Sequence, residues 1–337
     1  MSTIKKLPIL ATVPRSGTWF LRYAVSFLIH LDRGGRIEDR LTGEVVGRPS
    51  GMPFDFRRFR GGPLFLTRRS LPREQLFIGH TVCPGFATWA KDFASWNKTA
   101  FHVPGYDYLH EGFIYAYTPI DLAGEVEYAS LSVAALEQAA AVGCSAPMAL
   151  VYRNPLAQAA SYFRYCIGHM DLAYSTFEGR PLAQVPFRDF LFGRALPSFA
   201  KQFVSFQAMA AHHPGLVRLV PYEYLMAQPV EVLADLLNHL QGTSRTDWRN
   251  LHYAARLARR EHLKAIEAEL GRSLDGSRAG NGSHMRTDRF EDGLHSGLGE
   301  EVVRQLSSMG VDARYFVETG NNTRGESQTQ QDYAAAE

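Results

Sequence analysis

The sequence predicts an α/β fold with parallel strands, and two strand–turn–helix segments carry this prediction. Leu7–Val13 and Met148–Tyr152 are short, continuous apolar runs, a pattern that is typical of strands buried on both faces of a parallel sheet. Each run is followed by a turn and then by a largely apolar helical segment, Trp19–His30 in one case and Leu156–Ile167 in the other. Because open α/β sheets bind ligands at the carboxyl ends of their strands, the two turns are the first candidates for a functional site.

The first turn, Pro14–Thr18, has the composition of an anion-binding loop. Backbone N–H groups at the start of a helix bind phosphate together with the helix dipole, and Gly17 lets the backbone approach closely. Ser16 and Thr18 add hydroxyl donors, and Arg15 adds a positive charge. The turn lacks the second glycine and the Lys-Ser/Thr pair of a Walker A loop, so it gives little support to magnesium-dependent NTP hydrolysis.

The second turn combines an arginine at the end of a strand with a serine in the following helix. Arg153 follows the apolar run directly, and Pro155 stands where the first turn of a helix tolerates proline. Ser161 comes two turns into the helix. A permanently charged fork of donors beside a hydroxyl is suited to a phosphate. Two such loops indicate a nucleotide that carries phosphates at two separate places.

These two motifs resemble those of PAPS-dependent sulfotransferases. Pro14–Trp19 is similar to the 5′-phosphosulfate loop of that family, which is usually written P-K-S-G-T-T-W. Arg153–Pro155, followed by Ser161 and Tyr162, is similar to the family's 3′-phosphate motif, R-N-P-x-x-x-x-x-S-Y.

Two further matches follow in the order that the family has. Val220–Leu225 resembles a late strand ending in Y-E-D-L, and Ser283–Arg286 resembles the approach to a C-terminal R-K-G loop. The resemblance implies a single α/β domain over residues 1–319, with a central parallel sheet flanked by helices in a P-loop-like architecture. Residues 320–337 are rich in Gln, Asn, Ser and Ala and are predicted to be a disordered tail.

The resemblance also implies a cofactor and its contacts. The cofactor is 3′-phosphoadenosine-5′-phosphosulfate (PAPS), the product is 3′-phosphoadenosine-5′-phosphate (PAP), and no metal is implied. By their positions in the motifs, the residues that hold the 5′ end are Arg15, Ser16, Gly17, Thr18 and Trp19. The residues that hold the 3′-phosphate are Arg153, Ser161 and Arg286, and Tyr222 lies near the adenosine.

A histidine is expected to act as the base for an acceptor hydroxyl. Family members often place a catalytic histidine at a strand end in the pattern K-T-H, and here the apolar run Leu76–Gly79 predicts a strand that ends at His80. The unperturbed pKa of histidine, ~6.5, suits proton abstraction near neutral pH. Arg15 is expected to stabilise the negative charge that develops on the departing phosphate oxygen.

Three differences from the family pattern keep other functions open. The lysine two residues before the histidine is Ile78 here, the R-K-G loop reads Arg286-Thr287-Asp288, and residues 86–144 form an aromatic-rich insertion. The insertion is a lid or wall for a partly apolar acceptor, a small core of its own, or both. The alternative functions are a nucleotide-dependent kinase with a variant phosphate loop and a catalytically inactive PAP-binding protein.

Composition agrees with a soluble enzyme, and the resemblance implies a small-molecule, lipid-like or glycan acceptor with a hydroxyl. The chain has 337 residues, 45% hydrophobic and 21% charged, with a formal net charge of +2. This balance gives no general case for nucleic-acid binding, and no apolar run is long enough to span a membrane. Three cysteines outside metal-ligand spacing favour a reducing, cytoplasmic location.

Secondary structure in the remaining chain is predicted from hydrophobic periodicity and from the positions of glycine and proline. Residues 32–72 are rich in glycine and proline and are predicted to be mostly loop. Further helices are predicted at residues 130–141, 197–211, 230–240, 250–270 and 300–309. A polar, glycine-rich loop over residues 272–299 carries Arg286.

Overall fold

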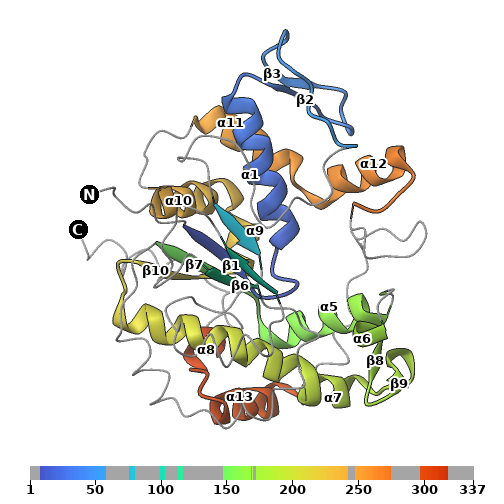
Figure 1. Ribbon diagram of the computed structural model, residues 1–337, viewed down its shortest axis with the longest axis vertical. Coiled ribbons are helices and arrows are strands. Elements are labelled where there is room, and N and C mark those ends of the chain that lie inside the picture. The colour runs from blue at the N-terminus through green and yellow to red at the C-terminus, as the bar shows by residue number, and fades with distance from the viewer. Residues whose placement is uncertain are drawn as a thin grey trace.

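A four-stranded parallel sheet, with strand order β10-β7-β1-β4, forms the centre of the molecule (Figure 1). The computed structural model describes residues 8–57, 76–79, 99–102, 113–116, 147–167, 169, 172–241, 247–274 and 297–317. The strands of the sheet are β1 (Ile9–Thr12), β4 (Phe77–Gly79), β7 (Met148–Tyr152) and β10 (Val217–Pro221). The predicted α/β fold with a central parallel sheet flanked by helices is confirmed.

Helices cover both faces of the sheet because its inner strands are apolar on both sides. Along β1, Ile9 and Ala11 pack into one core cluster and Leu10 packs into the other. The first cluster is covered by α5 (Pro155–Ile167), α8 (Leu196–His212) and α13 (Gly299–Ser308), and the second by α1 (Thr18–Asp32), α10 (Pro229–Gln241) and α11 (Trp248–Leu257) (Figure 1). Within the described ranges, no helix has the length and apolar character needed to cross a membrane.

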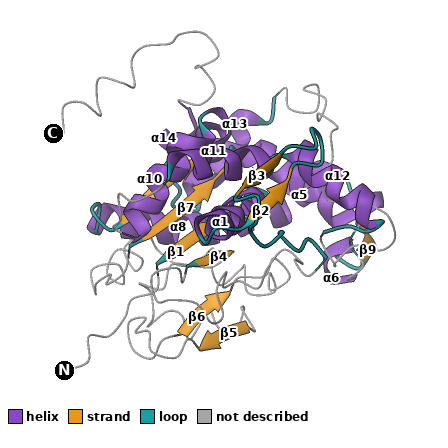
Figure 2. Ribbon diagram, turned by 90° about the horizontal axis from the view of Figure 1, so that it is seen from above, coloured by secondary structure: helices purple, strands orange, loops and turns teal. Residues whose placement is uncertain are grey.

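Shorter elements complete the described part of the chain. They are α6 (Leu172–Ser175), β8 (Thr176–Phe177), β9 (Arg180–Pro181), η4 (Leu182–Gln184), α7 (Phe187–Phe190), the π-helical η5 (Leu191–Ala195), α9 (Tyr222–Ala227), α12 (Arg260–Leu270) and α14 (Arg314–Val317). The predicted insertion contributes one antiparallel pair, β5 (Thr99–His102) and β6 (Phe113–Ala116), to one side of the central sheet (Figure 2). The rest of the insertion, the predicted helix at 130–141 and the tail lie outside the described residues.

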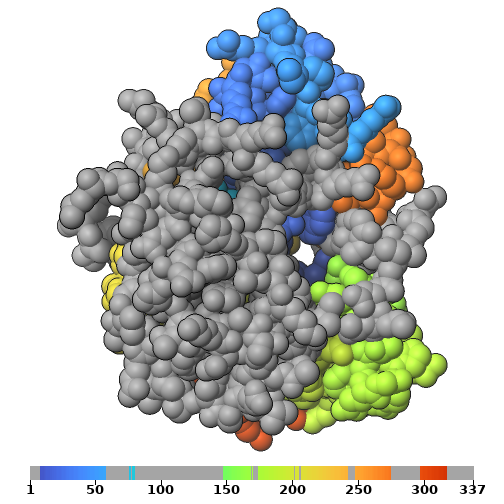
Figure 3. All heavy atoms as spheres, viewed as in Figure 1, coloured from blue at the N-terminus to red at the C-terminus, as the bar shows by residue number. Residues whose placement is uncertain are grey.

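The segment predicted to be mostly loop contains a hairpin of two short strands, β2 (Arg36–Glu38) and β3 (Val45–Gly47). Ile37 and Val46 are buried in the same core cluster as Leu31 of α1, so the hairpin packs on the end of that helix. Figure 3 shows residues of this region on the surface at the top of the molecule. Strands of three residues between glycines and prolines are too short to produce a recognisable period.

The helix predicted over residues 250–270 is two helices, and the prediction of a continuous helix was wrong. The chain between α11 and α12 turns at Arg259, whose ψ of 151° is extended. The His262 ring, on α12, lies 2.7 Å from the Leu257 carbonyl oxygen at the end of α11. The break lets both helices bury apolar residues in one core cluster, among them Leu251 and Leu263. The predicted helices at 197–211, 230–240 and 300–309 correspond to α8, α10 and α13.

Acidification below neutral pH is expected to destabilise the fold through His262. Burial lowers the pKa of this residue, which is 1% exposed. The hydrogen bond with the Leu257 carbonyl oxygen and the carboxylate of Asp39, 4.0 Å from Nε2, act in the opposite direction. An unfolded chain therefore binds a proton at about pH 6.5, before the folded protein does, and stability is lost as the pH falls below that value. The melting temperature measured between about pH 7 and about pH 5 should fall less in His262→Gln than in the wild type. An equal fall in both proteins would contradict the assignment.

Candidate functional site

The first predicted anion loop, between β1 and α1, has two residues in left-handed backbone conformations. Arg15 has a φ of 69° and Gly17 a φ of 85°. Glycine adopts this region freely, whereas an arginine pays about 1–2 kcal/mol for it. The Ser16 N–H donates to the Val13 carbonyl oxygen at 3.0 Å, which closes the turn before α1 begins at Thr18. The loop is thus a tight turn whose shape depends on contacts that hold Arg15.

The second predicted anion loop, between β7 and α5, is fixed by a helix cap. The Asn154 Oδ1 accepts a hydrogen bond from the Leu156 N–H at 3.1 Å, and Pro155 is the first residue of α5. The Asn154 N–H donates to Glu223 Oε1 at 3.1 Å, which ties the loop to α9. Arg153 therefore lies between a buried strand end and a capped helix, at the carboxyl edge of the sheet.

The two loops and the start of α9 come together at this edge. Arg15 Nε donates to Ser161 Oγ at 3.2 Å, which joins the first loop to α5. The Arg153 guanidinium carbon lies 5.0 Å from the centre of the Tyr222 ring. The same ring packs on Gly17, where a Cβ atom would approach it to 3.1 Å. Five of the residues predicted from the sequence are therefore neighbours, although up to 207 positions separate them along the chain (222 − 15).

Two buried donors, one in each loop, lack a hydrogen-bond partner among the described residues. They are the hydroxyl oxygen of Ser16, a fully buried residue, and the Nε of Arg153. Buried donors left unpaired in this way cost stability, so each one calls for an explanation such as a ligand. The Thr18 hydroxyl, by contrast, is 2.7 Å from the Thr12 hydroxyl. An anion bound between the loops would supply acceptors for Ser16 and Arg153.

The other predicted site residues are placed differently. Trp19 lies in the first turn of α1, with its ring stacked on Tyr23 at 6.1 Å between centroids. Tyr222, expected in a strand, is the first residue of α9, because β10 ends at Pro221. His80 and Arg286 lie outside the described residues, and their roles stay predictions.

Three residues outside the sequence motifs contact the first loop or the end of the strand before it. Gln158 Nε2 donates to the Pro14 carbonyl oxygen at 2.8 Å, and Gln202 Nε2 donates to the Thr12 carbonyl oxygen at 3.0 Å. The guanidinium carbon of Arg15 lies 5.0 Å from the centre of the Tyr165 ring. A signal was present for two of them, because positions 158 and 165 share a helical face with position 161.

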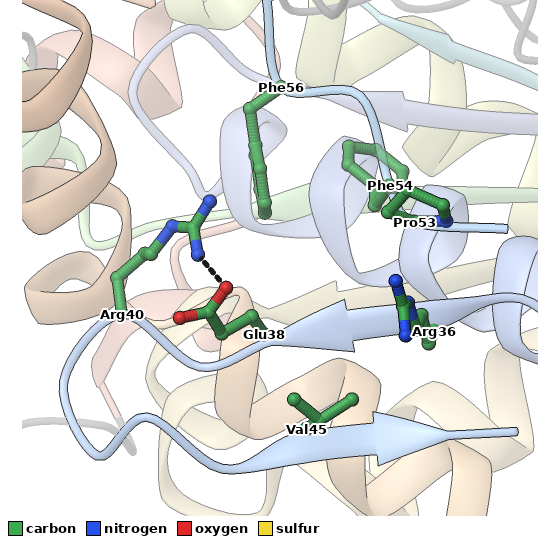
Figure 4. A pocket seen from close by; sticks show the side chains of 7 residues that line it. All are labelled: Arg36, Glu38, Arg40, Val45, Pro53, Phe54 and Phe56. Atoms are coloured by element: carbon green, nitrogen blue, oxygen red, sulfur yellow. Dashed lines mark ion pairs between the residues drawn. The ribbon is translucent and has the colours of Figure 1, made fainter. Parts of the chain in front are cut away.

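A pocket of about 210 Å³ lies on the β2–β3 hairpin, next to Phe54 and Phe56 (Figure 4). Its cations already have partners, since Arg40 pairs with Glu38 and Glu269 and Arg36 donates to the Pro49 carbonyl oxygen. Charges that are matched internally are typical of a structural ion-pair group, and no ligand is assigned to this pocket. In the part of the chain that the structure describes, no group of three or more metal-ligating side chains gathers either.

Comparing Gly17→Ala with Gly43→Ala is expected to separate the cost of backbone strain from the effect of crowding Tyr222 at the site. Gly43 is a matched control, because it has a φ of 72° and nothing within 4 Å of an added Cβ. Both substitutions should reduce the free energy of unfolding by about 1–2 kcal/mol through the left-handed backbone. Only Gly17→Ala should displace Tyr222 and weaken nucleotide binding, measured by calorimetry. Equal binding by the two variants would show that the Gly17–Tyr222 contact does not matter.

No protein-family model matches the sequence, and no curated protein matches it. Among solved structures, the chain is similar to mouse sulfotransferase SULT7A1 complexed with PAP, with 13% identity, a TM-score of 0.47, and coverage of 100% of this chain and 90% of that one. It is also similar to retinol dehydratase with retinol and PAP, at 13% identity and a TM-score of 0.41, covering 97% of this chain and 85% of that one. A second retinol dehydratase structure, in complex with androsterone and PAP, has 14% identity and a TM-score of 0.43, and the match covers 98% of this chain and 84% of that one. Identities and TM-scores this low leave the functional inference to the residues of the loops themselves.

Proposed function

We propose that this protein is a PAPS-dependent sulfotransferase that transfers a sulfuryl group to the hydroxyl of a small-molecule, lipid-like or glycan acceptor. The observation that carries the proposal is a pair of buried donors at the two loops, Ser16 Oγ and Arg153 Nε, which have no hydrogen-bond partner among the described residues. These atoms belong to the two motifs that resemble the 5′- and 3′-phosphate motifs of the family. The Tyr222 ring, in contact with both Gly17 and Arg153, supplies an aromatic surface of the kind on which an adenine stacks.

The two ends of the nucleotide would be held by different loops. Arg153 and Ser161, with Arg286, would bind the 3′-phosphate through charge-assisted hydrogen bonds. Ser16, Gly17 and Thr18, with Trp19, would hold the 5′ end at the start of α1. The N–H groups of a first helical turn have no partner within their helix, and the helix dipole favours an anion there.

The chain's own residues would move one proton and stabilise one charge. The bound cofactor would supply the sulfuryl group. His80 would take the proton of the acceptor hydroxyl as its oxygen bonds to sulfur. Arg15, already oriented by Ser161 at 3.2 Å, would stabilise the electron pair that stays on the phosphate oxygen when the S–O bond breaks. No step needs a metal or an oxidant, and we propose the reducing cytoplasm as the location.

Two other functions make different demands on the same site. A nucleotide-dependent kinase needs magnesium and a carboxylate near Arg15 to hold it. An inactive PAP-binding protein keeps Arg153 and Ser16 but gains nothing from His80. Ile78, which stands where the family has a lysine, is the residue that favours the inactive form.

Calorimetry with PAP and with ATP, each with and without magnesium, separates the sulfotransferase from the kinase. We expect PAP to bind tightly without metal and ATP to bind weakly. A preference for magnesium-ATP would overturn the proposal. Labelled PAPS, offered with a panel of phenols, sterols and sugars, then distinguishes a sulfotransferase from an inactive PAP-binding protein.

A further inference from the structure

One face of α5 contacts the first loop through three residues, Gln158, Ser161 and Tyr165. We name these three residues the clamp face. Gln158 contacts the backbone of the loop, through the Pro14 carbonyl oxygen, and the other two contact the Arg15 side chain. Their spacing of three and four residues puts all three on one side of the helix.

The hydrogen bond from Gln158 acts on the peptide unit that sets the strained conformation. The Pro14 carbonyl belongs to the planar peptide that joins Pro14 to Arg15. Gln158 Nε2 holds its oxygen at 2.8 Å and so fixes the orientation of the peptide plane from which the φ of Arg15 is measured. That φ is 69°, in a region that non-glycine residues rarely occupy. A conformation of this kind persists only where its surroundings hold it.

Gln158 is unusual for a helix residue at this depth. The residue is 2% exposed, and it lies between Ala157 and Ala159, in a helix that packs against the sheet. A buried amide costs free energy unless it is hydrogen-bonded. Its Nε2 is paired with the loop, and its Oε1 has no partner among the described residues. The residue is therefore poorly explained as core packing and well explained by its bond to the loop.

We propose that Gln158 is a positioning residue for recognition of the 5′ end of the nucleotide, an inference that rests on the proposed function. Its amide holds the Pro14–Arg15 peptide so that the Arg15 guanidinium reaches Ser161 and Tyr165. Because Arg153 and the Asn154 cap stand at the start of the same helix, α5 links the 3′-phosphate contacts to the geometry of the 5′ loop.

The test compares two ligands that differ only at the 5′ end, PAP and adenosine 3′-phosphate. Gln158→Met keeps the size of the side chain and removes the hydrogen bond. We expect it to weaken PAP binding about tenfold and to leave adenosine 3′-phosphate binding within about twofold. The matched control is Gln207→Met, on α8, where Nε2 donates to the Gly310 carbonyl oxygen at 3.1 Å, away from both loops. It should leave both affinities unchanged.

A second measurement tests, without any nucleotide, whether Gln158 of the clamp face holds the first loop. In the ligand-free protein, hydrogen exchange of the peptide containing Ser16 to Thr18 should be about tenfold faster in Gln158→Met than in the wild type or in Gln207→Met. Unchanged exchange, unchanged PAP affinity, or equal weakening of both ligands would each overturn the role of Gln158. If the wild type fails to bind PAP while hydrogen exchange responds as expected, the proposed function is wrong, but the role of Gln158 in holding the first loop is supported.

Discussion

Arg153→Ala is expected to weaken PAP binding by about 10- to 100-fold while leaving the protein folded. The substitution removes a charged donor whose net contribution to a hydrogen bond with phosphate is about 1.5–3 kcal/mol. It also removes the guanidinium that lies 5.0 Å from the Tyr222 ring centre. The substitution also removes the Nε that has no partner among the residues the structure describes, so the free energy of unfolding should change little.

The ligand dependence of this loss identifies the group that Arg153 binds. Adenosine 5′-phosphate lacks the 3′-phosphate, so its affinity should be nearly the same in the wild type and in Arg153→Ala. Arg153→Lys should give an intermediate loss, because lysine keeps the charge and lacks the planar fork. Arg218, an exposed cation on the neighbouring strand β10 that pairs with Asp235, is the matched control for general electrostatics. If Arg218→Ala weakens PAP as much as Arg153→Ala, the contact is not specific.

The parts of the site that the sequence predicted are those in which a local pattern determines a local structure. Met148–Tyr152 is buried throughout, as its continuous apolar run predicted. Asn154 and Pro155 form the cap and first residue of α5, which follows from the preferences of those residue types alone. Once two parallel strands end at one edge of a sheet, the turns after them must be close together, and Arg15 does reach Ser161.

The contacts that the sequence did not predict depend on which elements pack together. The pairing of Tyr222 with Gly17 and Arg153 follows from the place of β10 beside β7, and no pattern within the chain specifies strand order. Gln158 is an ordinary helix residue by propensity, and its hydrogen bond is visible only when Pro14 is seen beside it. The backbone conformation of Arg15 could not be predicted either, because an arginine in a sequence does not indicate a positive φ.

His80→Ala is expected to reduce sulfuryl transfer by at least about 100-fold, the usual contribution of a general base. In the sheet, β4 runs parallel to β1, with Gly79 opposite Ala11. The chain therefore leaves β4 at the same edge of the sheet at which the first loop leaves β1, and His80 is the next residue in sequence. Because the base acts on the acceptor and not on the nucleotide, the affinity for PAP should be retained.

Turnover, PAP affinity and pH dependence together decide whether His80 is the base. In the wild type, kcat/KM for the acceptor found by screening should rise with pH, because only the neutral imidazole accepts a proton. That rise should be lost in His80→Ala, and added imidazole should restore part of the rate. His212, an exposed histidine at the end of α8, gives the control substitution. A parallel loss of PAP affinity would assign His80 to binding, and wild-type turnover in His80→Ala would place the base on another residue.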